Sequence, residues 1–165
     1  MQYKMRYASP LGEMLLVCDG DGLTGAWFVG QKYFAAGLEE AAQEREHEYL
    51  LSAAKWLDIY FSGRIPDYTP KLYLIGSSFR TAVWEELMKI PYGETRTYGE
   101  ISVPAARRLG KEKMSAQAVG GAVGHNPISV IVPCHRVIGA DGSLTGYAGG
   151  IDKKLALLRL EGSYK

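Results

Sequence analysis

The sequence predicts an α+β fold in which a small antiparallel sheet with one helix is followed by a helix-rich second part. Three observations predict it: strand-like runs separated by turn residues over 1–29, a helical period of apolar residues that begins near residue 46, and three capped helical segments after residue 76. A length of 165 residues suits one domain or two small ones. We expect an N-terminal α/β domain over 1–75 and a second domain over 76–165.

The N-terminal third contains three candidate strands. They cover 1–8, 13–19 and 23–29, and the turn sequences Ser-Pro-Leu-Gly at 9–12 and Gly-Asp-Gly at 20–22 separate them. Strands joined by tight turns pair antiparallel, so we expect a small antiparallel sheet.

A helix follows the sheet. From Glu46 onwards apolar residues recur at helical spacing, namely Leu50, Ala53, Leu57 and Tyr60. Gly63 and Pro66 end this helix. The segment 64–76 contains two prolines and no helical period, which is typical of a connection between domains.

The second part begins with three helical segments. Ser77 or Ser78 caps the first, whose apolar residues are Phe79, Val83, Leu87 and Ile90. Thr97 and Glu100 form a capping box that starts the second, and Pro104 must kink or restart that helix before it ends near Gly110. Ser115 caps the third, over 115–126.

The remaining chain predicts a strand, a hairpin and a closing helix. The apolar strand covers 128–132, the hairpin is centred on Asp141-Gly142, and the helix ends at Gly162 with Ile151, Leu155 and Leu158 on its buried face. Two helices joined by a short turn, followed by a β-wing and a last helix, are the plan of a winged helix-turn-helix, which binds DNA.

Composition narrows the function classes. With 47% hydrophobic and 22% charged residues the chain has enough apolar material for a core, which excludes general disorder. No run approaches the roughly 18 apolar residues of a membrane span, and the N-terminus lacks a secretory signal, so we expect a cytoplasmic protein. Cys18 and Cys134 are then free thiols, and no cysteine or histidine spacing predicts a metal site.

The net charge of +1 conceals an asymmetry. Residues 1–75 carry 7 basic and 10 acidic side chains, whereas residues 76–165 carry 12 and 8. Four basic residues fall within seven positions of the second part: Arg107, Arg108, Lys111 and Lys113. Such a cluster is either a solvated face or a contact for a polyanionic partner.

Cys134 is the first candidate for chemistry, since it follows Pro133 where the chain must leave its strand. The alternative is a buried, inert cysteine. His135 favours the reactive interpretation, because an imidazole that accepts the thiol proton raises the fraction of thiolate. The two side chains share a pocket only if the backbone turns at this point, since neighbouring residues of a strand face opposite sides.

Other residues sit against their local preferences. Glu161 lies at the C-terminal end of the last helix, where the helix dipole disfavours a carboxylate. Gly120, Gly121 and Gly124 together cost on the order of 2–3 kcal/mol within a helix. Close helix packing or the close approach of a nucleic acid would explain them. Asn126 is either a turn former or an amide that fixes the cysteine segment.

Several motifs resemble the O6-alkylguanine-DNA alkyltransferases, also called methylated-DNA-protein-cysteine methyltransferases. They are Pro-Cys-His-Arg-Val-Ile within NPISVIVPCHRVIG, AVGGAVGHNP before it, and GYAGG and LLRLEG after it. The resemblance covers 79–162 and implies a ribonuclease H-like N-terminal domain beside a winged helix-turn-helix.

The resemblance implies a DNA repair protein that flips an alkylated guanine out of the duplex and moves the alkyl group from its O6 to Cys134, with O4-alkylthymine as a further candidate substrate. His135 acts as base through a water, Glu161 orients His135, and Asn126 joins the same network. Tyr98 donates a proton to the departing base. A thioether offers no route back, so each molecule acts once and needs no cofactor.

The resemblance also implies two groups of binding residues. The base pocket is lined by Val137, Tyr147 and Ala148, and Thr97, Ser115, Gln117 and Gly120 lie on the side of the DNA. Gln117 stands where the family commonly has an arginine that fills the gap left by the flipped base, and Ala148 stands where some relatives have serine. We expect the protein to bind double-stranded DNA. We also expect it to be a monomer, because no long heptad run is present.

Two other classes remain open at this stage. A non-catalytic module that recognises alkylated DNA would carry another residue in place of Cys134. A cysteine hydrolase or redox protein would need turnover or a resolving thiol, and Cys18 lies in a predicted strand far away in the sequence.

Overall fold

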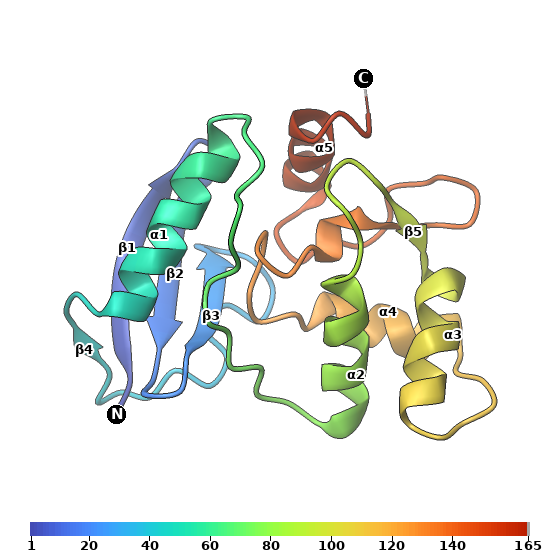
Figure 1. Ribbon diagram of the computed structural model, residues 1–165, viewed down its shortest axis with the longest axis horizontal. Helices are drawn as coiled ribbons and strands as arrows, with labels where there is room; N and C mark the ends of the chain where they lie inside the picture. The colour runs from blue at the N-terminus through green and yellow to red at the C-terminus, as the bar shows by residue number, and fades with distance from the viewer. Residues whose placement is uncertain (165) are drawn as a thin grey trace. The chain divides into compact units, whose positions relative to one another are not determined.

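In the computed structural model, which describes residues 1–164, the chain forms two compact units (Figure 1). The first unit consists of Met1–Leu74 together with Pro127–Ile131, and the second holds the other residues. Both mix helices with a small sheet, so the predicted α+β class is confirmed. The expected division into 1–75 and 76–165 stays a prediction.

The first unit is built on a four-stranded sheet with the order β3-β2-β1-β4. Strands β1 (Tyr3–Ser9), β2 (Gly12–Cys18) and β3 (Leu23–Phe28) are antiparallel neighbours, as their turn sequences predict. Strand β4 (Gln43–Glu44) pairs parallel with the start of β1. Two residues are too short for a recognisable sequence period, which is why the prediction missed this strand.

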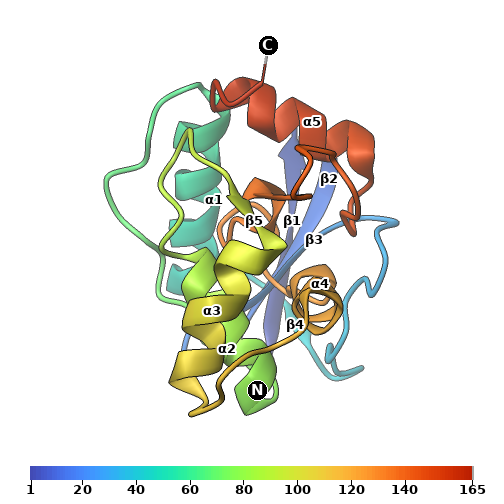
Figure 2. The same ribbon diagram turned by 90° about the vertical axis from the view of Figure 1, so that its right-hand side faces the viewer.

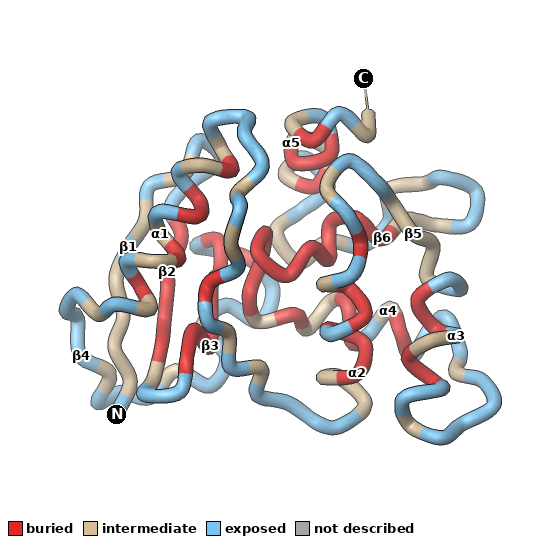
Figure 3. Tube along the Cα trace, viewed as in Figure 1, coloured by how far each residue is buried: buried red, intermediate tan, exposed pale blue. Residues whose placement is uncertain are grey.

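Helix α1 (Glu48–Phe61) covers one face of this sheet. The four predicted apolar residues, Leu50, Ala53, Leu57 and Tyr60, are all buried. The hydroxyl of Tyr7 on β1 donates to Asp58 of α1 over 2.7 Å, so the odd-numbered side chains of β1 face the helix. Figure 3 shows buried residues along β2, β3 and α1, where they form the core of this unit.

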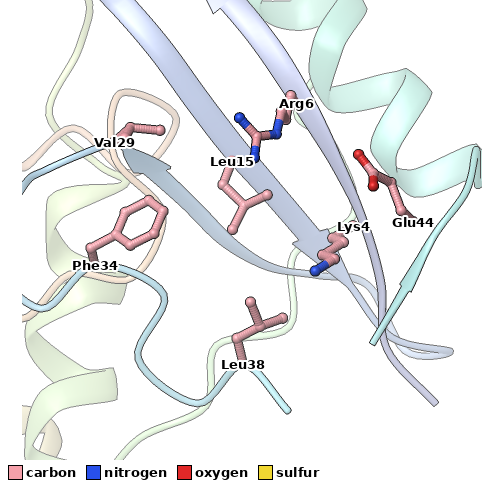
Figure 4. Close-up of a pocket in the computed structure, with 7 residues that line it drawn as sticks. All are labelled: Lys4, Arg6, Leu15, Val29, Phe34, Leu38 and Glu44. Atoms are coloured by element: carbon pink, nitrogen blue, oxygen red, sulfur yellow. The ribbon is translucent and has the colours of Figure 1, made fainter. Parts of the chain in front are cut away.

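The opposite face of the sheet carries a pocket of about 310 Å³ (Figure 4). Arg6 and Leu15 are cross-strand partners and therefore point to this same side. The remaining lining side chains come from β1, β4 and the segment after β3, namely Lys4, Val29, Phe34, Leu38 and Glu44. The pocket therefore combines an apolar floor with charges of both signs.

The segment 127–131 is not the strand that its apolar sequence predicts. Only Ile128 bridges to the sheet, through hydrogen bonds that join Ala26 to Pro127 and to Ser129, each 2.8 Å long. Val130 has a φ of 72°, and a residue in this left-handed region ends a strand. The strand prediction for 128–132 is therefore wrong.

The second unit packs three helices together, α2 (Ser78–Leu87), α3 (Tyr98–Arg108) and α4 (Ala116–Gly124), which Figures 1 and 2 show side by side. Ser77, Thr97 and Ser115 cap them as predicted. The indole of Trp84 donates to the carbonyl of Ala122 over 2.8 Å and so ties α2 to α4. Helix α3 continues through Pro104, so a restart of the helix at this residue does not occur.

The wing differs from the predicted hairpin. Strand β6 (Val137–Ile138) pairs parallel with β5 (Arg96–Thr97), and no second wing strand follows it among the described residues. The turn at Asp141-Gly142 does form, closed by a 2.9 Å bond from the Gly139 amide to the Ser143 carbonyl. A turn sequence fixes only the local bend, so the hairpin prediction is wrong.

The closing helix α5 (Ile151–Leu160) buries a different face from the predicted one. Its buried residues are Lys154, Leu157 and Leu158, while Ile151 is half exposed. Only Leu158 was predicted correctly, because the true buried face is rotated from the predicted one by roughly 70° about the helix axis. None of the helices in residues 1–164 has the length and apolar content of a membrane span.

Candidate active site

A tight turn places the predicted nucleophile. Cys134–Arg136 form a single turn of 3₁₀ helix after Pro133, with the amide of Arg136 donating to the carbonyl of Pro133 over 3.0 Å. Successive side chains in such a turn point about 120° apart instead of to opposite sides. The backbone thus makes the turn that a shared environment for Cys134 and His135 requires.

His135 and Glu161 form the centre of a buried network. The His135 Nε2 lies 2.6 Å from Glu161 Oε2, and neither side chain is exposed to solvent. Glu161 is ionised, so Nε2 carries the proton and donates it to this carboxylate. Nδ1 of His135 is then the unprotonated nitrogen, and it is buried with no hydrogen-bond partner among the described residues. In this tautomer the lone pair of Nδ1 is available to accept a proton.

Arg136 completes the network. Its Nε donates to Glu161 Oε1 over 2.7 Å, and its Nη1 donates to the carbonyl of Ile90 over 2.7 Å. The Arg136 residue is 8% exposed, so this ion pair is largely shielded from water. His135 and Arg136, with the Gly93 amide at 3.5 Å, therefore satisfy both oxygens of Glu161, which explains a carboxylate at the unfavourable end of α5.

The surroundings lower the pKa values of both Glu161 and His135. Burial would raise the pKa of Glu161, but the hydrogen bonds and charges of His135 and Arg136 outweigh burial and lower this pKa to about 2. Burial also lowers the pKa of His135 below its usual range, against the opposing effect of Glu161. The pair therefore consists of a carboxylate and a neutral imidazole at neutral pH.

The thiol of Cys134 is enclosed. It is 4% exposed, and burial raises its pKa to about 11. Three influences oppose burial: a hydrogen bond with the side chain of Asn126, the positive charge of Lys154, and the amides of Cys134 and His135. Asn126 is itself held by a 2.9 Å bond from Nδ2 to the carbonyl of Val132. The Asn126 side chain and these amides can therefore donate hydrogen bonds to a thiolate, which forms when a base removes the thiol proton.

Tyr98 begins α3 close to the same region. Its hydroxyl donates to the carbonyl of Thr145 over 2.9 Å, and burial raises its pKa above the usual range. Lys154 donates to the same Thr145 carbonyl over 3.3 Å. The side chain of Tyr98 thereby contacts the segment that contains Tyr147 and Ala148, two of the predicted pocket residues.

The other predicted residues lie in β6, in the segment before α5, and near the N-termini of α3 and α4. Val137 is buried in β6, and Tyr147 and Ala148 lie partly exposed in the irregular segment before α5. Thr97 and Ser115 are helix caps. Gln117 lies exposed in the first turn of α4, and Gly120 faces the ring of Tyr98, 3.9 Å from the position of an added Cβ.

The glycines of α4 have no packing explanation on their outer side. A Cβ added at Gly121 or Gly124 would meet nothing within 4 Å. The buried residues of α4 are instead Val119, Ala122 and Val123. The face that holds Gln117 and Gly121 is therefore open and free of bulky side chains, which favours the close approach of a ligand over close helix packing.

Two residues of the site could not be assigned from the sequence. Arg136 stands beside His135, but nothing in the sequence pairs it with Glu161 across 25 positions. Lys154 did leave a signal, because it falls within the apolar stripe of Ile151, Leu155 and Leu158.

Of the basic cluster, Arg108 forms ion pairs with Glu85 and Glu86 over 2.6 and 3.0 Å. Arg108 thus has a structural role within the second unit.

Comparison with known families gives two matches that together span most of the chain. Residues 78–163 match the DNA binding domain of 6-O-methylguanine DNA methyltransferase, and residues 2–69 match its ribonuclease-like domain. The chain belongs to the 6-O-methylguanine DNA methyltransferase family. The predicted family is thereby confirmed, and direct repair of alkylated DNA with it.

Individual members of the methyltransferase family are similar over their full lengths. The methylated-DNA-protein-cysteine methyltransferase of Methanosarcina acetivorans is 46% identical over 162 residues, which is 98% of this chain and 99% of the relative. The solved O6-methylguanine methyltransferase of Mycobacterium tuberculosis is 42% identical with a TM-score of 0.81, covering 100% of this chain and 95% of that one. The M. tuberculosis protein has also been solved in complex with DNA, with the same identity and TM-score over 98% and 92% of the two chains.

Proposed function

We propose that this methyltransferase transfers an alkyl group from O6 of guanine in double-stranded DNA to the sulfur of Cys134, once per molecule. The observation that carries the assignment of roles is the tautomer of His135. Its Nε2 is fixed by Glu161, which leaves Nδ1 as a base in the turn that also holds Cys134.

The first step is proton removal from the thiol. His135 accepts the proton of Cys134 through a water, and the imidazolium that results lies against the carboxylate of Glu161. Arg136 keeps this carboxylate ionised and fixes its orientation. The Asn126 amide and nearby backbone amides favour the thiolate and oppose burial, which still raises the pKa of the thiol to about 11.

The second step is displacement at a saturated carbon. The sulfur lone pair forms the new S–C bond while the C–O6 bond breaks and its electrons pass to the guanine. Tyr98 donates its hydroxyl proton so that guanine departs as a neutral base, and Tyr98 regains a proton from His135 or from solvent. The protein keeps a thioether, so each molecule reacts once.

The substrate must enter as an extruded nucleotide, because an O6 atom inside a duplex lies out of reach of a cysteine that is 4% exposed. Val137, Tyr147 and Ala148 line the pocket for the base in this proposal. The hydroxyl of Tyr98, which donates to Thr145 in the structure, turns to the guanine when the base enters.

The DNA lies against α4 in this proposal. Its open face presents small residues together with Gln117, and the caps Thr97 and Ser115 stand at the N-termini of α3 and α4, where backbone amides favour phosphates. Gln117 replaces the arginine common in the family, and its amide hydrogen-bonds the orphaned cytosine without adding charge. The complex of the M. tuberculosis relative with DNA supports this partner.

We further propose a monomer that works in the cytoplasm, whose reducing conditions keep Cys134 a thiol.

The decisive experiment is an intact-mass measurement after incubation with duplex DNA that contains one O6-methylguanine. We expect the protein to gain a single methyl group, located by peptide mapping on the peptide with Cys134, and to stop at one group when DNA is in excess. An unchanged mass, or continued turnover, would contradict the proposal.

The variant Cys134→Ala separates repair from recognition. It should bind methylated duplex as well as the native protein does, but it should transfer nothing. Transfer at the native rate by this variant would place the acceptor elsewhere. Native protein that binds methylated DNA without gaining mass would favour the non-catalytic recognition module instead.

A further inference from the structure

Lys154 is a buried charged residue that the proposed reaction does not use. Its side chain is 0% exposed, and it lies on α5 between the apolar residues of the buried face. No carboxylate forms an ion pair with it among residues 1–164. Instead its Nζ donates to two backbone carbonyls, those of Val137 at 2.5 Å and Thr145 at 3.3 Å. A buried ammonium without a counter-ion is costly, so its retention calls for a reason.

The two carbonyls belong to the two segments that line the expected base pocket. Val137 follows the turn that holds Cys134, and Thr145 precedes Tyr147 and Ala148. One ammonium group therefore ties these two segments to each other and to α5. A Lys ammonium has three protons, so it donates to both carbonyls at once.

The carbonyl of Thr145 has a second donor, the hydroxyl of Tyr98 at 2.9 Å. If Tyr98 is to give its proton to the departing guanine, this hydrogen bond must break first. The side of this carbonyl that Lys154 reaches is partly buried, so losing both donors there would be unfavourable. With Lys154 present, the Thr145 carbonyl keeps one donor throughout.

We propose that Lys154 is a positioning residue that holds the Thr145 and Val137 carbonyls and so releases the hydroxyl of Tyr98 for the substrate. The inference rests on the proposed function. Lys154 does not touch the reacting atoms, and it acts through Thr145 and Tyr98. The electrostatics agree with this placement, because burial lowers the pKa of Lys154 to about 8, whereas a thiolate at Cys134 would oppose that shift.

The test compares Lys154→Met with the native protein in single-turnover reactions on methylated duplex DNA. Methionine is of similar length and carries neither charge nor donor. We expect the rate at saturating DNA to fall by at least about tenfold, because Tyr98 stays engaged with Thr145, while affinity for unmodified duplex stays within about threefold. Lys153→Met, the neighbouring lysine of the same helix, is the matched control and should keep the native rate. An unchanged rate for Lys154→Met overturns the proposal.

A double-mutant cycle with Tyr98→Phe distinguishes positioning from a general structural role. Because Lys154 acts by freeing the Tyr98 hydroxyl, Lys154→Met should matter less when that hydroxyl is absent. The fold-reduction in rate should be at least about threefold smaller in the Tyr98→Phe background than in the native protein. Equal costs in the two backgrounds would mean that Lys154 acts independently of Tyr98 and would overturn the proposal.

Circular dichroism and thermal unfolding show whether Lys154→Met is folded. If Lys154→Met is not folded, Lys154→Gln replaces it in the same cycle. The glutamine amide still donates to one carbonyl, so we expect a smaller loss of rate with the same dependence on Tyr98. A native protein that gains no methyl group refutes the proposed function. A native protein that does gain one, with additive costs in the cycle, refutes the role of Lys154 alone.

Discussion

At the scale of single residues, the site depends on how two buried oxygens of Glu161 are satisfied. His135 and Arg136 each donate to this carboxylate, at 2.6 and 2.7 Å. The loss of one member of this buried network would lower the stability of the protein, because the remaining charges stay buried without their partner. The same hydrogen bonds that fix the His135 tautomer therefore also contribute to stability.

The lowered pKa of Glu161 predicts a loss of stability in acid. Its pKa falls from the usual 4.5 to about 2 on folding, so the contribution is present above pH 4.5 and is lost as pH falls from there towards 2. A shift of this size corresponds to roughly 3 kcal/mol. Urea unfolding at pH 7 and pH 3 should show a clearly smaller difference between the two pH values for Glu161→Gln than for the native protein.

The matched control for this prediction is Glu13→Gln. Glu13 forms an exposed ion pair with Arg6, a kind of pair that contributes at most about 1 kcal/mol. This variant should lose stability in acid as the native protein does. The same loss in Glu161→Gln would mean that other groups cause the acid sensitivity.

At the scale of elements, α4 combines a buried apolar side with an open side of glycines. Gly121 has no neighbour within 4 Å of an added Cβ, and its φ is an ordinary helical one. Helix propensity alone would favour alanine there by about 1 kcal/mol. A glycine at this place leaves the backbone of α4 open to the close approach of a ligand.

The variant Gly121→Ala should therefore be more stable and bind DNA less well. We expect the free energy of unfolding to rise by up to about 1 kcal/mol, and the affinity for duplex DNA to fall severalfold because the added methyl group keeps the backbone away from the groove. Thermal unfolding and a fluorescence anisotropy titration measure the two effects. A gain in stability without any loss of affinity would remove α4 from the DNA interface.

At the scale of the whole molecule, charge is unevenly divided along the chain. Residues 1–75 carry net −3 and residues 76–165 carry net +4. Within the second group Arg108 is already paired with Glu85 and Glu86, whereas Arg107, Lys111 and Lys113 are exposed. Electrostatic attraction to DNA should therefore reside in the exposed members of the cluster.

The salt dependence of DNA binding measures this distribution. Replacing Lys111 and Lys113 by alanine should reduce the slope of log affinity against log salt by up to about 0.9 for each phosphate that these lysines neutralise in the native complex. The matched control replaces Lys4 and Lys55 of the first unit by alanine, with the same change in net charge, and should leave the slope as it is. Equal slopes for the two double variants would show that Lys111 and Lys113 bind no phosphate.

Much of the fold follows from local signals. The first three strands, the helix from residue 48, and the three capped helices of the second unit were predicted because turn residues, caps and apolar periods are encoded within a few positions. The errors lie where distant interactions decide. The segment 128–132 has a strand-like sequence, yet only Ile128 finds a partner strand, and the turn at Asp141 has no returning strand to pair.

The candidate site shows the same division. Cys134, His135 and Glu161 were predicted from the sequence, and the structure brings His135 and Glu161 into contact across 26 positions. Arg136 and Lys154 were missed as members, because their partners are a carboxylate and backbone carbonyls that are distant along the chain. Backbone acceptors leave no mark in a sequence, so Lys154 was detectable only as a charge in an apolar stripe.

The sequence by itself determined the family and most local elements and predicted the nucleophile, because each of these resides in a short run of residues. Only the tertiary structure decided which nitrogen of His135 is unprotonated, what holds Glu161 ionised, and that Tyr98 and Lys154 share one carbonyl. The physical reason is that protonation states and hydrogen-bond partners depend on burial and on atoms brought together from distant positions, which no local pattern specifies.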